Sequence, residues 1–197
     1  MSVVLASASR ARRVLLEAAG VALLVDPAAV DEASLKASLA LEGAGAPAMA
    51  ETLAEVKASQ VSPRHPALIT LGADQILECE GRCYDKPEDL AAAKAQLQAL
   101  RGRRHRLISS LVALRGGQRL WHHTGEAQLT MRDFSDEFLA AYLTAAGPAM
   151  LESVGAYQLE GPGAQLFSRI EGDYFTILGL PLLPLLEFLR AQGELAA

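Results

Sequence analysis

Short apolar runs alternate along the chain with stretches in which hydrophobic residues recur every three or four positions. Such runs are typical of buried strands and the longer pattern of amphipathic helices, so the alternation predicts an α/β protein. Near the amino terminus, Val3–Ala6 predicts a buried strand. A helix is expected from about Arg10 to Gly20, and Val21–Val25 predicts a second strand.

The next stretch predicts a long helix over Ala48–Ser62. Four of its apolar residues are expected on one face: Met49, Leu53, Val56 and Val61. Two further apolar runs, Leu68–Leu71 and Gln75–Leu77, flank Gly72-Ala73-Asp74. This arrangement places Asp74 within a strand or at its end.

The second half of the chain predicts three more helices, a hairpin and a short strand. They are helices over Pro87–Leu100, Asp136–Ala146 and Leu182–Gln192, a hairpin of His105–Leu114 with Gln118–Thr130, and a strand within Gly172–Gly179. Two acidic residues in the first turn of the helix from Pro87 suit its dipole, and Ser135 is a good N-cap. Leu41–Ala48 is the expected flexible connection. Since no boundary separates independent domains, residues 1–197 are interpreted as one domain.

Composition narrows the function classes. The chain of 197 residues is 51% hydrophobic and 21% charged, which excludes a disordered protein. Its net charge of −5 argues against a dedicated nucleic-acid binder, which would carry a basic excess. A small anionic ligand needs only a few local cations and remains compatible with this charge.

The cysteines and the apolar segments indicate a cytoplasmic protein. Cys79 and Cys83 lack nearby zinc ligands and are interpreted as reduced thiols. The most apolar run, Ile177–Leu189, is interrupted by glycine and proline and is too short to span a bilayer. At the amino terminus, the apolar stretch precedes the arginines, the reverse of the order in a signal peptide.

The first candidate for chemistry lies between the first strand and the first helix. Ser7 and Ser9 supply hydroxyls there, the helix start supplies free backbone N–H groups, and Arg12 and Arg13 supply guanidinium groups. Together they would suit a chain of phosphates. The alternative, a capped helix whose arginines face water, stays open.

Two places supply acids. Asp74 is framed by small and apolar residues, where a carboxylate is costly unless it meets a cation, a metal or hydrogen-bond donors. It is therefore the best single candidate for a functional acid, against the alternative of an acid that caps a turn. Asp31-Glu32 gains interest only if the fold brings a metal near; otherwise it is a solvated pair.

Further candidates are lysines and a glycine-rich loop. Lys86, held by Pro87, could reach a phosphate as a point charge, and Lys57 has the same two readings, phosphate ligand or solvated lysine. The glycines of Gly155–Gly163 allow close approach of the backbone to a ligand, or serve tight turns only. The four histidines lack metal-like spacing and are interpreted as surface residues: His65, His105, His122 and His123.

Taken in order, these segments resemble the Maf family of nucleotide pyrophosphatases from Leu5 to about Leu189. The matching motifs are Leu5–Ser9 with Arg12 and Arg13, Leu53–Ala58, Gly72–Gln75, Lys86-Pro87, Gly155–Tyr157 and Gly179–Leu182. One departure is Arg10, which stands where the family usually has a proline.

The resemblance implies a two-lobed, mixed-sheet α/β fold of the Maf/ITPase-like kind, often dimeric, with a nucleotide in the cleft between the lobes. It implies cleavage between the α- and β-phosphates of a nucleoside triphosphate, with a divalent cation (Mg²⁺, Mn²⁺ or Co²⁺). By the same resemblance, Asp74 is the catalytic proton acceptor. Glu32 and Asp74 are the candidate metal ligands, with a water partner as the alternative role of Glu32. No nucleic-acid or membrane partner is expected, and a homodimer is compatible.

The resemblance also assigns the substrate contacts. They are Ser7, Ser9, Arg12, Arg13, Lys57, Gln75, Lys86 and Glu160. Gln75 and Glu160 favour the subgroup that acts on 7-methyl-GTP, since a carboxylate at 160 would pair with the guanine edge. Alternatives are a dTTP/UTP or broad-specificity pyrophosphatase, and a binding protein that regulates septum formation.

Overall fold

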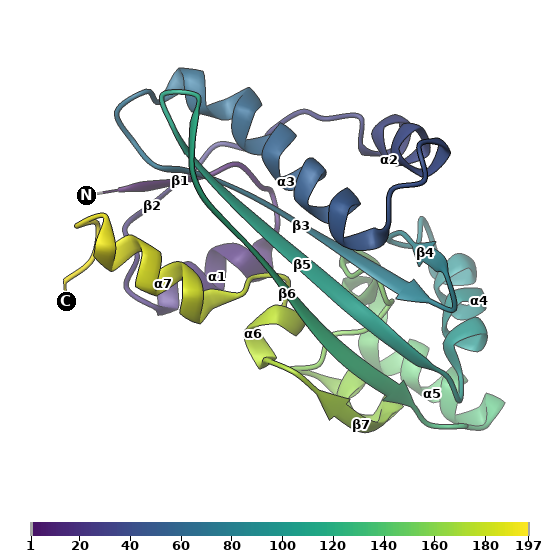
Figure 1. Ribbon diagram of the computed structural model, residues 1–197. Helices are drawn as coiled ribbons and strands as arrows, with labels where there is room; N and C mark the ends of the chain where they lie inside the picture. Colours follow the sequence, from purple (N-terminus) through teal and green to yellow (C-terminus); the bar gives the residue numbers. More distant parts are fainter. Residues whose placement is uncertain (1, 197) are drawn as a thin grey trace. The chain divides into compact units, whose positions relative to one another are not determined.

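The computed structural model describes residues 2–196, which form a seven-stranded mixed sheet with helices packed on it (Figure 1). The strands are β1 Val3–Leu5, β2 Leu23–Val25, β3 Thr70–Cys79, β4 Arg82–Tyr84, β5 Arg104–Arg115, β6 Gln118–Met131 and β7 Phe167–Glu171. The strand order is β2-β1-β3-β5-β6-β7, and β4 pairs with β3. This architecture confirms the predicted α/β class.

Seven α-helices and three 3₁₀ turns complete the described part of the chain. They are α1 Arg10–Ala18, α2 Glu32–Leu41, α3 Ala46–Val61, α4 Leu90–Leu100, α5 Asp136–Ala146, α6 Tyr174–Ile177 and α7 Leu182–Ala191, with η1 Ser62–Arg64, η2 Gly147–Glu152 and η3 Pro162–Leu166. None of these helices is long and apolar enough to cross a membrane.

The chain divides into two compact units, each assembled from separate stretches of sequence. The first contains the residues up to Gln75, Ile108–Gly125 and those from Tyr174 on; the second contains Ile76–Leu107 and Glu126–Asp173. The strands β3, β5 and β6 therefore carry residues of both units.

In the first unit, helices cover both faces of the sheet. Strand β1 runs parallel to both β2 and β3. Since side chains alternate along a strand, Val112 and Leu114 of β5 pack with α3, whereas Leu111 and Ala113 join a core with α1 and α7. Figure 1 shows α1 (purple) and α7 (yellow), from opposite ends of the chain, side by side on one side of the sheet, with α3 on the other.

Helix α3 and strand β3 approach each other unusually closely at Gly72. A Cβ atom at this residue would lie 1.9 Å from the carbonyl oxygen of Ala54 and 2.8 Å from the backbone nitrogen of Ala58. Only glycine fits such an approach without moving the helix. The glycine therefore sets the distance from which α3 side chains reach β3.

The second unit packs α4 and α5 around its own core. Leu97 of α4, Leu139 of α5 and Leu129 of β6 are all fully buried. The N-cap of α5 follows the sequence prediction, because the Ser135 hydroxyl accepts a hydrogen bond from the backbone N–H of Phe138 at 3.2 Å. Strand β7 then pairs antiparallel with β6.

Several predicted boundaries are wrong. Helix α4 begins at Leu90 rather than Pro87, because Asp89 is its N-cap and accepts a hydrogen bond from the Ala92 N–H at 2.7 Å. Gly172–Gly179 holds the short helix α6 instead of a strand, and the strand precedes it as β7. The two apolar runs around Asp74 form one continuous strand.

Two corrections concern the helices before β3. Helix α2 was not predicted, and Leu41, expected to begin a flexible connection, is its last residue. On α3, Val56 is only half-buried, whereas Lys57 lies on the buried face together with Leu53 and Val61. Lys57, and not Val56, therefore belongs to the buried face of α3.

Candidate active site

Lys57 and Asp74 form a buried ion pair between α3 and β3. The Nζ atom of Lys57 lies 2.6 Å from Oδ1 of Asp74 and donates a hydrogen bond to it. Only 7% of Lys57 and 4% of Asp74 is exposed. The close approach at Gly72, two residues before Asp74, brings the lysine within reach. Asp74 therefore meets the cation that its apolar surroundings require.

The same ammonium group also binds Glu32, the first residue of α2. Nζ of Lys57 lies 2.7 Å from Oε1 of Glu32, whose side chain is 43% exposed. Burial by itself would raise the pKa of Glu32, but the hydrogen bond and charge of Lys57 outweigh it, so the pKa is lowered. One cation thus bridges a buried and a half-exposed carboxylate.

Arg12 ties the start of α1 to two distant backbone segments. Its Nε donates to the carbonyl oxygen of Gly179 at 2.9 Å, and its Nη1 donates to that of Ala73 at 2.9 Å and to the Ser7 hydroxyl at 3.1 Å. Burial lowers the pKa of Arg12, and the negative charges of Asp74 and Glu32 oppose this shift. The guanidinium group thereby fixes the backbone of the residue next to Asp74.

Ser9 and Gln75 form hydrogen bonds with other residues of the first unit. The Ser9 hydroxyl is the N-cap of α1 and accepts from the Arg12 backbone N–H at 3.5 Å. The Gln75 Nε2 donates to the Ser109 hydroxyl at 3.0 Å and to the carbonyls of Thr176 and Ile177 at 3.1 and 3.0 Å. Sequence reasoning missed the two carbonyls, because a backbone acceptor has no signature in the residue types. It also missed Ser109, which lies within the run that predicts a strand.

Three other predicted site residues are exposed. Arg13 is exposed on α1, 3.9 Å from the carboxylate of Glu17 on the same helix. Lys86, between β4 and α4, and Glu160, before η3, are exposed residues of the second unit. The first unit alone therefore brings together five predicted residues: Ser7, Arg12, Glu32, Lys57 and Asp74.

The carboxylates fit a divalent cation in their chemistry. Oδ2 of Asp74 is buried and has no hydrogen-bond partner among the described residues. In that part of the chain, no three His, Cys, Asp or Glu residues form a group that could hold a metal. Mg²⁺, however, is commonly held by one or two carboxylates together with substrate phosphates. Glu32 and Asp74 satisfy this smaller requirement.

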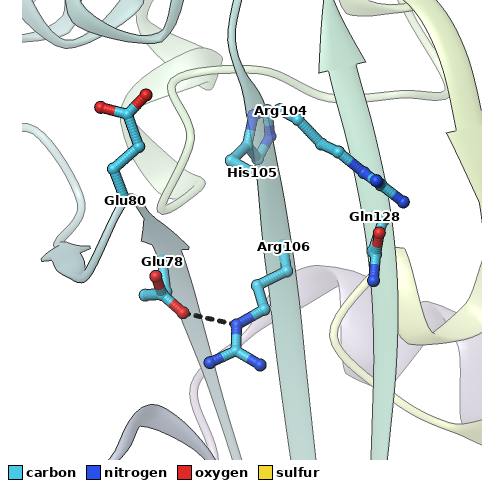
Figure 2. A pocket seen from close by; sticks show the side chains of 6 residues that line it. All are labelled: Glu78, Glu80, Arg104, His105, Arg106 and Gln128. Carbon is cyan, nitrogen blue, oxygen red and sulfur yellow. Dashed lines mark hydrogen bonds and ion pairs between the residues drawn. The ribbon is translucent and has the colours of Figure 1, made fainter.

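The second unit has a shallow hollow of about 190 Å³ in which most of the charged side chains are more exposed than those around Lys57 (Figure 2). Arg106 lies 2.5 Å from Glu78 and 3.1 Å from Glu126, and Arg104 lies 3.1 Å from Glu171. In Figure 2, the side chains of Glu78 and Arg106 point toward each other across neighbouring strands. Both arginines therefore form ion pairs with carboxylates on other strands of the same sheet.

His105 of β5 is buried, and its prediction as a surface residue is wrong. It is only 3% exposed, and its Nε2 lies 2.8 Å from the hydroxyl of Tyr157. Burial lowers the pKa of His105 to about 4, so the ring is neutral near pH 7. Its position between Arg104 and Arg106 concealed it, because strand alternation turns it to the other face.

Comparisons with known proteins found matches over nearly the whole chain. A sequence profile described as Maf-like protein matches residues 2–192. The chain is 58% identical to a nucleoside triphosphate pyrophosphatase of Paramagnetospirillum magneticum, over 97% of this chain and 98% of that protein. It is 55% identical to a protein of the same name from Granulibacter bethesdensis, over 99% of both. It is also 48% identical to a 7-methyl-GTP pyrophosphatase of Rhizobium etli, over 98% of this chain and 96% of that protein.

Proposed function

Because the chain belongs to the Maf family, we propose that it hydrolyses a nucleoside triphosphate to a nucleoside monophosphate and diphosphate. The observation that carries this proposal is the buried carboxylate of Asp74, which lies 2.6 Å from an ammonium group bound to a second carboxylate. The relatives named nucleoside triphosphate pyrophosphatase match over nearly the whole chain and support the same reaction.

In the proposed reaction, Asp74 accepts a proton from the attacking water. The water oxygen forms a bond to the α-phosphorus as the bond from this phosphorus to the bridging oxygen breaks, and diphosphate leaves with that oxygen. Arg12 keeps Asp74 in place through the Ala73 carbonyl. Lys57 offers its charge to the phosphates, and Ser7, Ser9, Arg13 and Lys86 are proposed as further phosphate contacts.

We propose that Glu32 and Asp74 hold a divalent cation, with Mg²⁺, Mn²⁺ and Co²⁺ as the candidates. The ion would neutralise charge on the phosphates when bound. The unpartnered Oδ2 of Asp74 and the exposed side of Glu32 support these two residues as ligands.

For the base, we propose a preference for 7-methyl-GTP. Glu160 is exposed, so its carboxylate is accessible to the guanine edge and the positive charge of the methylated ring. Gln75 is proposed to contribute less to base recognition than Glu160, because its amide nitrogen already donates to three oxygens of the first unit. The relative named 7-methyl-GTP pyrophosphatase supports this preference. The relatives named only nucleoside triphosphate pyrophosphatase leave the dTTP/UTP and broad-specificity alternatives open.

A nucleotide panel tests the reaction and the base together. Purified protein is incubated with 7-methyl-GTP, GTP, dTTP, UTP and ATP in Mg²⁺, Mn²⁺ or Co²⁺, and diphosphate and orthophosphate are measured separately. We expect diphosphate with the monophosphate, fastest for 7-methyl-GTP. Release of orthophosphate alone would refute the cleavage site, and faster turnover of dTTP or UTP would refute the base preference.

The variant Asp74→Asn separates an enzyme from a regulatory binding protein. A side chain that cannot accept the proton should lower kcat by about a hundredfold or more while nucleotide affinity is kept. Unchanged turnover would refute Asp74 as the acceptor, whereas a wild type that binds the nucleotide but releases no diphosphate would favour the septum-formation role. We place the reaction in the cytoplasm, and sedimentation of the purified chain tests the proposed homodimer.

A further inference from the structure

Lys57 occupies the place between the two carboxylates that are proposed to hold the metal. Its Nζ lies 2.6 Å from Oδ1 of Asp74 and 2.7 Å from Oε1 of Glu32. Divalent cations hold carboxylate oxygens at about 2.0–2.6 Å. An ion that contacts the same two oxygens would therefore overlap Nζ, and ammonium and ion exclude each other there.

Binding of the ion to the other oxygen of Asp74 would not remove its competition with the Lys57 ammonium group. Oδ2 is buried and has no hydrogen-bond partner within residues 2–196, but an ion bound to it would still face the ammonium charge across a single carboxylate. Because only 7% of Lys57 is exposed, little water screens the repulsion between the two cations. Lys57 thus opposes the ion at either oxygen unless its ammonium group moves.

We propose that Lys57 keeps the two carboxylates closed to free divalent cations and releases them only when a polyphosphate offers its ammonium group another anion. The inference rests on the proposed function, since the polyphosphate is the substrate. It makes binding ordered: the free protein binds the ion weakly, and the ion and the triphosphate bind together. The lysine then contacts phosphate in the complex and carboxylate in the free protein.

The test measures Mn²⁺ binding by electron paramagnetic resonance at pH 8, with no nucleotide and therefore no turnover. Lys57→Met leaves two carboxylates with no cation between them, so we expect Mn²⁺ to bind about tenfold more tightly than to the wild type. Lys94→Met, which removes an exposed lysine of α4, should leave the affinity unchanged. Adding Asp74→Asn to Lys57→Met should abolish the gain.

A second variant keeps the test decisive if Lys57→Met does not fold. Lys57→Gln is neutral as well, and its amide can still donate to one carboxylate, so it should also gain affinity for Mn²⁺. Lys57→Arg, which keeps the positive charge, should not. Equal or weaker Mn²⁺ binding by both neutral variants would overturn the inference.

A second arm adds a triphosphate analogue with a methylene group between the α- and β-phosphorus atoms. It should tighten Mn²⁺ binding by the wild type more than by Lys57→Met, because only the wild type has a lysine to transfer; an equal effect would refute the exchange. Diphosphate release by the wild type, measured separately, tests the proposed function. Normal release with no gain for the neutral variants would therefore refute the exchange alone.

Discussion

The first unit buries an ion cluster, whereas the second unit buries a neutral histidine and keeps its charges on an open sheet face. Lys57 is enclosed but contacts two carboxylates. His105 is equally enclosed, has an uncharged partner in the hydroxyl of Tyr157, and its pKa falls to about 4. A buried titratable group keeps its charge only where opposite charges surround it. The cluster around Lys57 is therefore where chemistry is expected.

The largest effect should come from removing the cation of the first unit. Lys57→Met takes away charge that would stabilise the phosphates in the transition state, and we expect kcat/KM to fall by about a hundredfold to a thousandfold. The measurement is diphosphate release under saturating Mg²⁺. Lys94→Met removes the same group from an exposed helix position and should retain wild-type activity; a similar loss in both would contradict the comparison.

Next in size is the close approach of α3 to β3. In Gly72→Ala, the new methyl group meets the Ala54 carbonyl, so the helix must move away; we expect a loss of about 3 kcal/mol in the free energy of unfolding in urea. Gly45→Ala is the matched control at the N-cap of α3, where the nearest atom to a new Cβ lies at 3.8 Å. It should lose no more than about 1 kcal/mol, which is the usual cost of alanine at an N-cap. An unaffected Gly72→Ala would show that the approach is not tight.

The neutral histidine of the second unit should show itself as a pH dependence of stability. The unfolded chain binds a proton at His105 near pH 6.5, whereas the folded chain does so only near pH 4. Stability therefore decreases as the pH falls from 6.5 toward 4, and His105 accounts for about 2 kcal/mol between pH 7 and pH 5.

His105→Gln removes this titration while keeping a side chain that can bond to Tyr157. The difference in urea-unfolding free energy between pH 7 and pH 5 should be about 2 kcal/mol smaller in this variant than in the wild type. The exposed His122 supplies the control, because His122→Gln should keep the wild-type slope. A parallel pH profile for His105→Gln would refute the neutral, buried ring.

The smallest effect is expected from breaking the ion pair between Arg106 and Glu78 in the hollow of the second unit. A double-mutant cycle with Arg106→Gln and Glu78→Gln should give a coupling below about 1 kcal/mol, because solvent screens the pair. Both single variants should keep diphosphate release within about twofold of the wild type. Strong coupling would contradict the screening by solvent, and a large loss of activity would mean that the hollow in Figure 2 is a second functional region.

The sequence predicted elements best where one local signal was strong. Ser135 marked the start of α5, and Gly116-Gly117 marked the turn between β5 and β6. It failed where signals competed. Pro87 suggested a helix start, but Asp89 caps the helix. Gly172–Gly179 was predicted to hold a short strand, although its residues Tyr174–Ile177 form α6.

For the site, residue type indicated Asp74 but not its partner. Lys57 follows Leu53 and precedes Val61 at helical spacing, so its place on the buried stripe was readable from the pattern. Because Val56 was predicted on that stripe, the buried position of Lys57 was not predicted. The bonds of Arg12 to the carbonyls of Ala73 and Gly179 were beyond reach, because they depend on how the backbone folds.

One of those bonds has a consequence for biosynthesis. The contact between the Arg12 Nε and the Gly179 carbonyl joins residues 167 positions apart. While the ribosome is still translating the preceding codons, a nascent chain already carries Asp74 and Lys57 but lacks this anchor for the arginine. The arginine clamp beside the acid is therefore completed only after Gly179 has been added, so a polypeptide terminated before that residue would carry the acid and the lysine without it.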